Sequence, residues 1–258
     1  MNVPSYLTSS RLTSLENVCH GFFTRQGGVS SDIFTSLNCG LASGDNLQDV
    51  IENRERVRES LGLDALFTLK QVHSNRVMVV DRGSDPTEVV EADGLVSMQQ
   101  GVGLGALGAD CAPVLFADID AGVVGSAHAG WQGALSGVTD SVIEKMCELG
   151  ALREKIVCAI GPAIGWVSYE VGTTFMEAVL DTSPIEAASF FRAGKDAGLP
   201  HFNLPGYIRA RIQHVGVEQI DLLNEDTYAN PDQFFSYRRS CHLNEAGYGR
   251  QISVIGLT

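Results

Sequence analysis

Residues 101–133 constrain the fold more than any other stretch, because they form the most apolar window of the chain and are rich in glycine. Two apolar runs in this window, residues 112–117 and 122–127, flank a short polar interruption at residues 118–121. Such a pattern is typical of two strands joined by a tight turn. The chain is therefore predicted to contain a buried antiparallel hairpin here.

The predicted hairpin brings a cysteine and a histidine together. If Ile119 and Asp120 form a two-residue turn, Cys111 lies directly opposite His128. Opposed residues have Cβ atoms about 4.5–5.5 Å apart, so both side chains can bind one metal ion or form a thiolate–imidazole pair. Glycines at both ends of the stretch leave room for a ligand near the backbone. We therefore predict a functional site here, with the strand register as a hypothesis.

The composition is that of a globular protein, with 258 residues of which 44% are hydrophobic and 19% charged. A chain of this length is compatible with one domain over residues 1–258. The net charge of −13 opposes a broad surface for nucleic acid or anionic membrane. We therefore expect a small-molecule partner, which, if anionic, would need a local group of arginines.

The cysteines and the start of the chain indicate a compartment. The six cysteines include no Cys-x-x-Cys pair, which favours a reducing, cytoplasmic environment. The first residues lack the basic and apolar regions of a secretory signal. Asp110, Asp118 and Asp120 interrupt the most apolar window, so we do not expect it to span a membrane. No long apolar helix face demands a partner, so we expect a monomer.

The remaining segments predict a mixed α/β domain, because the strands are too irregularly spaced for repeated βαβ units. A helix capped by Asp45 is expected at residues 46–61, with Leu47, Val50, Ile51, Val57 and Leu61 on its buried face. Residues 18–28 are expected to form a short strand that runs into a glycine turn. Further strands are expected at residues 66–80, 92–96, 156–160, 234–239 and 251–255, and further helices at residues 131–149, 173–180 and 207–215.

Two histidines join Cys111 as candidate metal ligands. His73 lies in the predicted strand 66–80, and His128 ends one strand of the hairpin. A His/Cys/His set leaves a fourth tetrahedral position for water, as in catalytic zinc sites. The spacing matches no local metal motif, so packed core histidines and a Cys111–His128 nucleophile pair remain alternatives.

Several charged residues outside the hairpin are candidates for substrate contacts. Arg25, in a glycine turn, is suited either to bind a phosphate or carboxylate or to brace its loop. Arg238 and Arg239 carry the same two alternatives. Glu170 is either a buried base or a charge at a helix N-terminus, and the latter is favoured.

Eight motifs occur in the order found in one known family. They read HGFFTRQGGVS, SLNCG…GD, QVHS, EADGLVS, GADCAPVLFAD, AHAGWQG, AIGPAIG…YEVG and FFSYRR…GR, and they span residues 19–256. The chain thus resembles the laccase-domain (multicopper polyphenol oxidase, YfiH-like) family, whose members are regarded as purine nucleoside phosphorylases with adenosine deaminase activity. The resemblance implies an α+β fold with mixed β-sheets layered between helices, likened to Cys/His toxin deamidases.

The resemblance also implies site residues. One Zn²⁺ ion would be bound by His73, Cys111 and His128, with Cu²⁺ possible in its place. Cys111 and His128 would take part in catalysis, and Asp110 would move protons. The nucleoside and phosphate would contact further polar residues, namely Arg25, Asn38, Gln71 and Arg238. Two positions depart from the family pattern: Gln132 stands where AHAGWRG has arginine, and NEDTYAN keeps only Thr227 of a Cys-Thr pair.

The expected activity is phosphorolysis of adenosine, inosine or methylthioadenosine, together with deamination of adenosine. Three alternatives come from other classes. They are a Cys111/His128 hydrolase or amidase that edits peptidoglycan precursors, a copper-dependent polyphenol oxidase, and a non-catalytic nucleoside-binding protein. A conventional multicopper oxidase needs more histidine ligands than the six in this chain, so phenol oxidation is expected only as a side activity.

Overall fold

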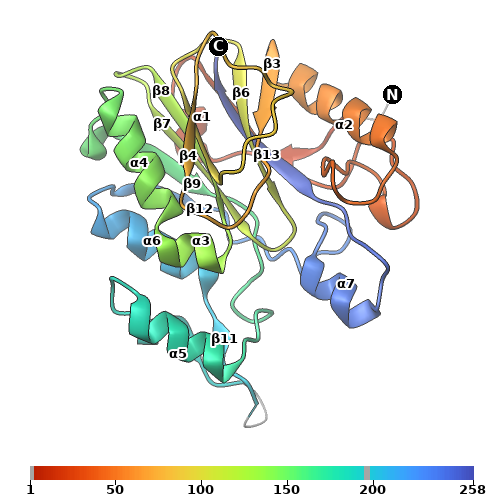
Figure 1. Cartoon of the computed structure of the whole chain (residues 1–258), viewed down its shortest axis with the longest axis vertical. Coiled ribbons are helices and arrows are strands. Elements are labelled where there is room, and N and C mark those ends of the chain that lie inside the picture. The colour runs from red at the N-terminus through yellow and green to blue at the C-terminus, as the bar shows by residue number, and fades with distance from the viewer. Residues whose placement is uncertain (1–2, 195–197) are drawn as a thin grey trace.

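The computed structural model describes residues 3–194 and 198–258, and two stacked β-sheets form its centre (Figure 1). The five-stranded sheet has the order β1-β2-β13-β6-β3 and the six-stranded sheet the order β12-β9-β7-β8-β5-β4. Both sheets are mixed, since β3–β6, β4–β5 and β9–β12 pair in parallel and the other neighbours are antiparallel. The expected α+β fold with mixed sheets between helices is confirmed. One domain over residues 1–258 stays a prediction.

The strands and helices have the following bounds. The five-stranded sheet comprises β1 (Tyr6–Leu7), β2 (Val18–Phe23), β3 (Ala65–Thr68), β6 (Val102–Gly108) and β13 (Gln251–Leu257). The six-stranded sheet comprises β4 (Val77–Val80), β5 (Gly94–Ser97), β7 (Ala112–Asp118), β8 (Val123–Ala129), β9 (Val157–Ile160) and β12 (Gln219–Leu222). A two-stranded ribbon pairs β10 (Phe191–Arg192) with β11 (His201–Phe202). The helices are α1 (Ser10–Thr13), α2 (Leu47–Ser60), α3 (Trp131–Ser136), α4 (Val138–Glu148), α5 (Thr173–Thr182), α6 (Leu204–His214) and α7 (Tyr237–Leu243).

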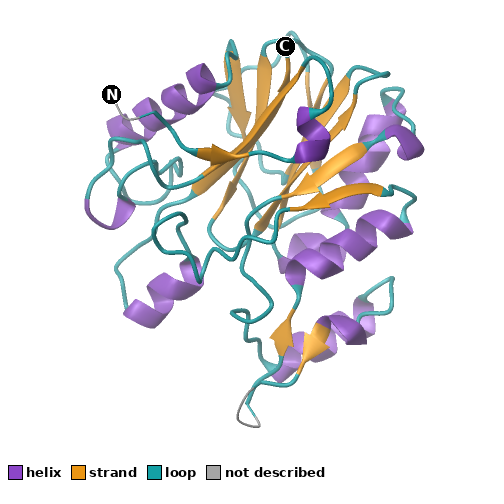
Figure 2. Ribbon diagram, turned by 180° about the vertical axis from the view of Figure 1, so that it is seen from behind, coloured by secondary structure: helices purple, strands orange, loops and turns teal. Residues whose placement is uncertain are grey.

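Helices cover the outer face of both sheets, so the central strands are buried on both sides (Figures 1 and 2). Along β7, Leu115 faces the space between the sheets, whereas its neighbour Phe116 packs toward α4 and α6. Along β13, Ile255 likewise faces inward and Val254 packs toward α2. Burial on both faces explains why these strands read as continuous apolar runs.

Glycines let α4 lie close to the six-stranded sheet. A Cβ atom at Gly94 would lie 2.7 Å from a methyl group of Val142, and one at Gly125 would lie 2.9 Å from the other methyl group. These contacts are too short for any side chain at either position, so the two glycines set the distance between helix and sheet.

The hairpin prediction is confirmed in outline and wrong in register. The strands β7 and β8 pair from Ala112 with Ala129 to Asp118 with Val123, so His128 faces Pro113 instead of Cys111. The connection is a four-residue loop, residues 119–122. The Asp118 carboxylate accepts hydrogen bonds from two amides of this loop, which favours the longer turn.

The expected strand 66–80 is wrong as a single element. It divides into β3 and β4, which lie in different sheets, and the segment between them is a loop that carries His73. His73 itself has a left-handed backbone conformation with φ of 60°, which no strand residue adopts.

Other boundaries also differ from expectation. The expected helix 131–149 divides into α3 and α4 because Gly137 has a left-handed conformation with φ of 89°. Residues 234–239 form no strand, since Ser236 caps the start of α7. Asn46 caps α2 in place of Asp45, and Leu47 and Ile51 are exposed instead of buried.

Within the described residues, no helix has the length and apolar character that crossing a bilayer requires.

His20 links β2 to the start of α1 and generates a prediction about pH. Its Nε2 atom accepts a hydrogen bond from the backbone N–H of Ser9, the N-cap of α1. Burial lowers the pKa of His20 to about 4. A histidine in the unfolded chain has its ordinary pKa near 6.5. Between about pH 4 and pH 6.5, the unfolded chain therefore binds a proton at His20 that the folded chain does not.

We accordingly expect the free energy of unfolding to fall as the pH drops from about 6.5 to about 4, with about 2 kcal/mol of the loss due to His20. His20→Gln keeps an acceptor for Ser9 and removes the titration. Urea unfolding of both proteins at pH 7.5 and 4.5 measures the difference. Equal losses in the two proteins would contradict this assignment.

Candidate active site

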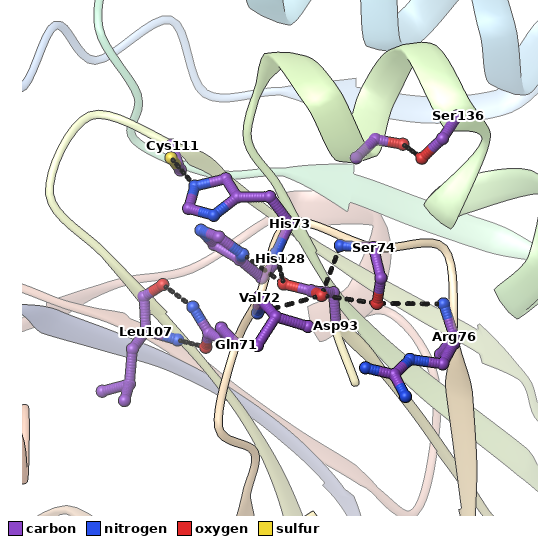
Figure 3. Close-up of polar contacts among 11 residues, drawn as sticks. Gln71, Val72, His73, Ser74, Arg76, Asp93, Leu107, Cys111, His128 and Ser136 are labelled. Atoms are coloured by element: carbon purple, nitrogen blue, oxygen red, sulfur yellow. Dashed lines mark hydrogen bonds and ion pairs between the residues drawn. The ribbon is translucent and has the colours of Figure 1, made fainter. Parts of the chain in front are cut away.

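Three side chains from separate segments converge beside the end of the hairpin (Figure 3). His73 comes from the loop between β3 and β4, Cys111 from the junction of β6 and β7, and His128 from β8. Their ligand atoms all lie within 4.8 Å of one another. The Sγ atom of Cys111 lies 3.7 Å from Nε2 of His73, and the two imidazole rings are 4.9 Å apart between centroids. The three side chains that the sequence analysis named as candidate ligands therefore do lie together, although the predicted register is wrong.

The wrong register does not separate Cys111 from His128. Cys111 comes one residue before the first pair, Ala112 with Ala129, so by extension of this register it would lie opposite Gly130 and diagonal to His128. Diagonal neighbours remain within reach of long or aromatic side chains. The imidazole of His128 is therefore long enough to reach Cys111 from this diagonal position.

Asp93 shapes the loop that carries His73. Its buried carboxylate accepts hydrogen bonds from the backbone amides of Val72, His73 and Ser74 at 3.2, 3.0 and 2.7 Å. The hydroxyl of Ser74 adds a fourth at 2.8 Å. These bonds satisfy backbone donors that would otherwise pair in a strand, so the chain leaves the sheet at this point.

The same carboxylate orients His128. The Oδ1 atom of Asp93 lies 2.9 Å from Nδ1 of His128, and the backbone N–H of His128 donates to the Asp93 carbonyl. A hydrogen bond at Nδ1 leaves Nε2 as the nitrogen that faces the site. Asp93 was not among the site residues predicted from the sequence, although a carboxylate in a polar turn directly before a buried strand is a signal of such a role.

Electrostatic coupling holds the cluster in a charged state. Burial opposes the ionised thiol, but the charge and hydrogen bond of His128 outweigh it and lower the pKa of Cys111 to about 6. Burial likewise opposes the imidazolium, but Cys111 and Asp93 raise the pKa of His128 to about 9. Hydrogen bonds from His128 and Ser74 overcome burial and lower the pKa of Asp93 to about 2.

The site fits a metal ion. Two imidazoles and a thiolate are ligands that zinc and copper both accept. The carboxylate of Asp93 on His128 supplies the second hydrogen bond that ligating histidines usually make. Gly130 leaves space beside the ligands, since a Cβ atom there would lie 2.6 Å from His73 and 2.9 Å from the Cys111 sulfur. Only glycine keeps this space open.

A cavity of about 380 Å³ opens onto His73 and Cys111. Its walls include the aromatic rings of Trp131, Tyr169 and Phe175, and the first and last of these meet edge to face at 4.7 Å. Arg238 adds a positive charge, and its guanidinium lies 5.4 Å from the Tyr169 ring. The cavity thus combines a flat apolar wall with a cation next to the candidate metal site.

Asp110 lines this cavity and also holds the start of α7. Its carboxylate accepts hydrogen bonds from the Thr227 hydroxyl at 2.7 Å and from the backbone N–H of Arg238 at 2.6 Å. Burial raises the pKa of Asp110, and these hydrogen bonds act in the opposite direction. Asp110 therefore fixes the position of the Arg238 backbone at the edge of the cavity. Thr227 in turn holds the Asp110 carboxylate in place through its hydroxyl group.

The other residues predicted to bind substrate lie elsewhere. Arg25 lines a second cavity, described below. Asn38 is fully buried, where its side chain bonds Asp45 and the backbone of Arg250. The amide of Gln71 pairs with both backbone polar groups of Leu107. Their part in substrate binding stays a prediction.

Glu170 and Gln132, two further positions noted in the sequence, are both exposed. Glu170 lies outside the first turn of α5, and its exposed side chain lines the cavity beside Arg238. Its backbone carbonyl accepts a hydrogen bond from the Arg238 guanidinium at 2.7 Å. Gln132, which replaces the family arginine, is exposed on α3.

Fold and site together define an α+β protein with a Cys–His–Asp cluster that can hold a metal ion at the end of an aromatic cavity. A family model described as multi-copper polyphenol oxidoreductase laccase matches residues 19–258. The chain belongs to this family.

Named relatives and solved structures agree with the match. A purine nucleoside phosphorylase of Corynebacterium glutamicum is 38% identical over 239 residues, which cover 92% of this chain and 93% of that protein. One from Deinococcus radiodurans is 37% identical over 249 residues, covering 93% and 89%. The crystal structure of the Bacillus licheniformis protein YfiH has a TM-score of 0.86 at 32% identity and covers 93% of each chain. A Neisseria meningitidis protein has a TM-score of 0.84 at 32% identity and covers 99% of each.

The space beside Gly130 generates a prediction about metal affinity. Gly130→Ala places a methyl group against His73 and Cys111, so we expect zinc binding to weaken by at least about tenfold. Competition with a chromogenic chelator measures the affinity. Gly83→Ala, where the nearest atom to a new Cβ lies at an ordinary 3.5 Å, serves as the control and keeps wild-type affinity. Unchanged zinc affinity in Gly130→Ala would show that the metal lies elsewhere.

The position of Asp93 generates a second prediction. Asp93→Asn keeps one acceptor oxygen and replaces the other with an NH₂ group that faces donors, so some of the hydrogen bonds to His128 and to the loop carrying His73 are lost, together with the negative charge. We expect zinc affinity to fall about 10- to 100-fold and the free energy of unfolding to fall by about 2 kcal/mol. Zinc titration and urea unfolding test both effects. Asp120→Asn removes only an exposed ion pair with Lys155, so it should leave zinc affinity unchanged and lower the free energy of unfolding by less than about 1 kcal/mol.

Proposed function

We propose that this protein is a zinc-dependent purine nucleoside phosphorylase that also deaminates adenosine. The observation that carries the proposal is the aromatic cavity that joins Arg238 to the His73–Cys111–His128 cluster. The relatives named as purine nucleoside phosphorylases support the substrate class, since they match this chain over most of its length.

Each wall of the cavity suits one part of a nucleoside. The rings of Trp131, Tyr169 and Phe175 can stack on a purine, which has two flat apolar faces. Arg238 keeps guanidinium N–H groups beyond its bond to Glu170, and these can donate to a phosphate. The exposed carboxylate of Glu170 can accept hydrogen bonds from ribose hydroxyls.

In phosphorolysis, a phosphate oxygen forms a bond to C1′ of the ribose while the bond from C1′ to N9 breaks. The electron pair of that bond stays on the purine, which leaves after protonation. Arg238 would hold the phosphate next to C1′, and the aromatic rings would hold the purine in line with it. The products are the free base and ribose 1-phosphate.

The residues of the cluster would also serve deamination. When bound by His73, Cys111 and His128, a zinc ion supplies Lewis-acid chemistry for activating water or a substrate oxygen. Asp93 keeps His128 in its orientation through Nδ1. We propose Asp110, which lies at the cavity beside Cys111, as the carboxyl that transfers protons to and from the purine.

Zinc-loaded protein incubated with adenosine, with and without phosphate, tests the proposal. Chromatography resolves adenine, inosine and hypoxanthine. We expect adenine and ribose 1-phosphate only when phosphate is present, and inosine under both conditions. Absence of all of these products would overturn the proposal, and inosine without adenine would leave deamination only.

Removing one ligand tests the dependence on metal. We expect His73→Ala to lose bound zinc and at least about 100-fold in turnover, because two remaining ligands bind the ion weakly. Elemental analysis and the adenosine assay measure the two effects. His214→Ala, an exposed change at the end of α6, should retain both. Normal turnover by a metal-free His73→Ala protein would contradict the zinc mechanism.

A second candidate function is a cysteine hydrolase or amidase. It is favoured by one observation, the chain of contacts from Asp93 through Nδ1 of His128 to Cys111, which matches an orienting carboxylate, a base and a nucleophile. Activity that resists chelators and is abolished by alkylation of Cys111 would select this candidate. Loss of activity on chelation would select the metal enzyme.

A further inference from the structure

A second cavity, of about 470 Å³, lies on the other side of the segment that begins α7. Phe235 and Arg239 of this segment line it, whereas Tyr237 and Arg238 line the cavity at Cys111. Arg25, which follows β2, completes the cationic part of the lining. The two cavities are therefore separate sites that share one stretch of backbone.

Arg25 is held in place by neutral groups. Its Nε atom donates to the Thr35 carbonyl at 2.7 Å and its Nη1 atom to the Pro231 carbonyl at 3.1 Å. The guanidinium lies 4.4 Å from the centre of the Phe235 ring. In the described part of the chain Nη2 makes no hydrogen bond, so an oriented donor remains available.

Arg239 is held in the same way. Its Nη1 atom donates to the carbonyls of Thr227 and Tyr228, and its Nη2 atom donates to that of Phe234. Across residues 3–194 and 198–258, no carboxylate forms an ion pair with either Arg25 or Arg239. Burial and the charge of Arg239 lower the pKa of Arg25, yet both guanidinium groups stay charged at neutral pH.

Arg25 and Arg239 are two partly buried like charges, and nearby carboxylates such as Glu245 act on both without forming an ion pair with either in the described residues. Burying charge without a counter-ion is costly, and a bound anion removes that cost. Asp32 and Glu245 also line the cavity and can accept hydrogen bonds from hydroxyl groups. The lining thus offers donors for an anion and acceptors for the hydroxyls of the same molecule.

We propose that this second cavity binds a small sugar phosphate, with Arg25 and Arg239 on the phosphate and Asp32 and Glu245 on the hydroxyls. The cavity is larger than inorganic phosphate needs, which favours a phosphate ester. Planar guanidinium groups match the geometry of phosphate oxygens. The catalysis proposed above places the phosphate on Arg238 and uses neither Arg25 nor Arg239, so this inference stands or falls independently of that function.

Titration calorimetry with ribose 5-phosphate, inorganic phosphate and ribose tests the proposal. We expect ribose 5-phosphate to bind more tightly than inorganic phosphate, and ribose alone not to bind. Arg25→Ala should weaken binding of ribose 5-phosphate by at least about tenfold, because a charge-assisted donor is lost. Arg82→Ala, which changes an exposed arginine that lines neither cavity, should leave this binding within about twofold.

A milder variant guards against misfolding of Arg25→Ala. Glu245 is exposed, and Glu245→Gln removes a like charge near the phosphate, so inorganic phosphate should bind about twofold more tightly. No binding of ribose 5-phosphate, or equal binding of inorganic phosphate, would overturn the proposal. Loss of binding in Arg238→Ala with retention in Arg25→Ala would do so as well.

Discussion

The arrangement of the site depends on one buried carboxylate. Asp93 binds the backbone of the loop around His73 and the Nδ1 atom of His128 at the same time. It therefore fixes two of the three candidate ligands and interrupts what would otherwise be a continuous strand. The hydrogen bonds to this carboxylate are strong because the acceptor is charged and buried. Each of them takes the place of a hydrogen bond to water that the carboxylate lost on burial. The chemistry at Cys111 follows from this placement.

The layered core gives this carboxylate a rigid support. Both sheets are covered by helices, so the strands that end at the site are buried on both faces. The segments with α5 and α7 lie beyond the ends of the sheets and supply the cavity walls (Figure 1). Rigid strands thus position the cluster, and the connecting segments shape the space for a ligand.

The start of α7 connects the two cavities. Asp110 anchors its backbone next to Cys111, and successive side chains of the same segment then face opposite sides. Arg238 and Arg239 are neighbours in sequence, yet they line different cavities. Their proximity in sequence therefore did not indicate that these two arginines line different cavities.

The sequence by itself predicted the buried hairpin from its apolar runs, and its motifs, through the family resemblance, predicted the mixed sheets between helices and the candidate trio of His73, Cys111 and His128, because apolar periodicity and motif content are local properties. Only the tertiary structure decided the register, since an Asx turn at Asp118 lengthened the loop. It also decided the role of Asp93 and the separation of Arg25 from Arg238. These depend on which distant backbone amides and side chains meet, and no local pattern along the chain records such long-range contacts.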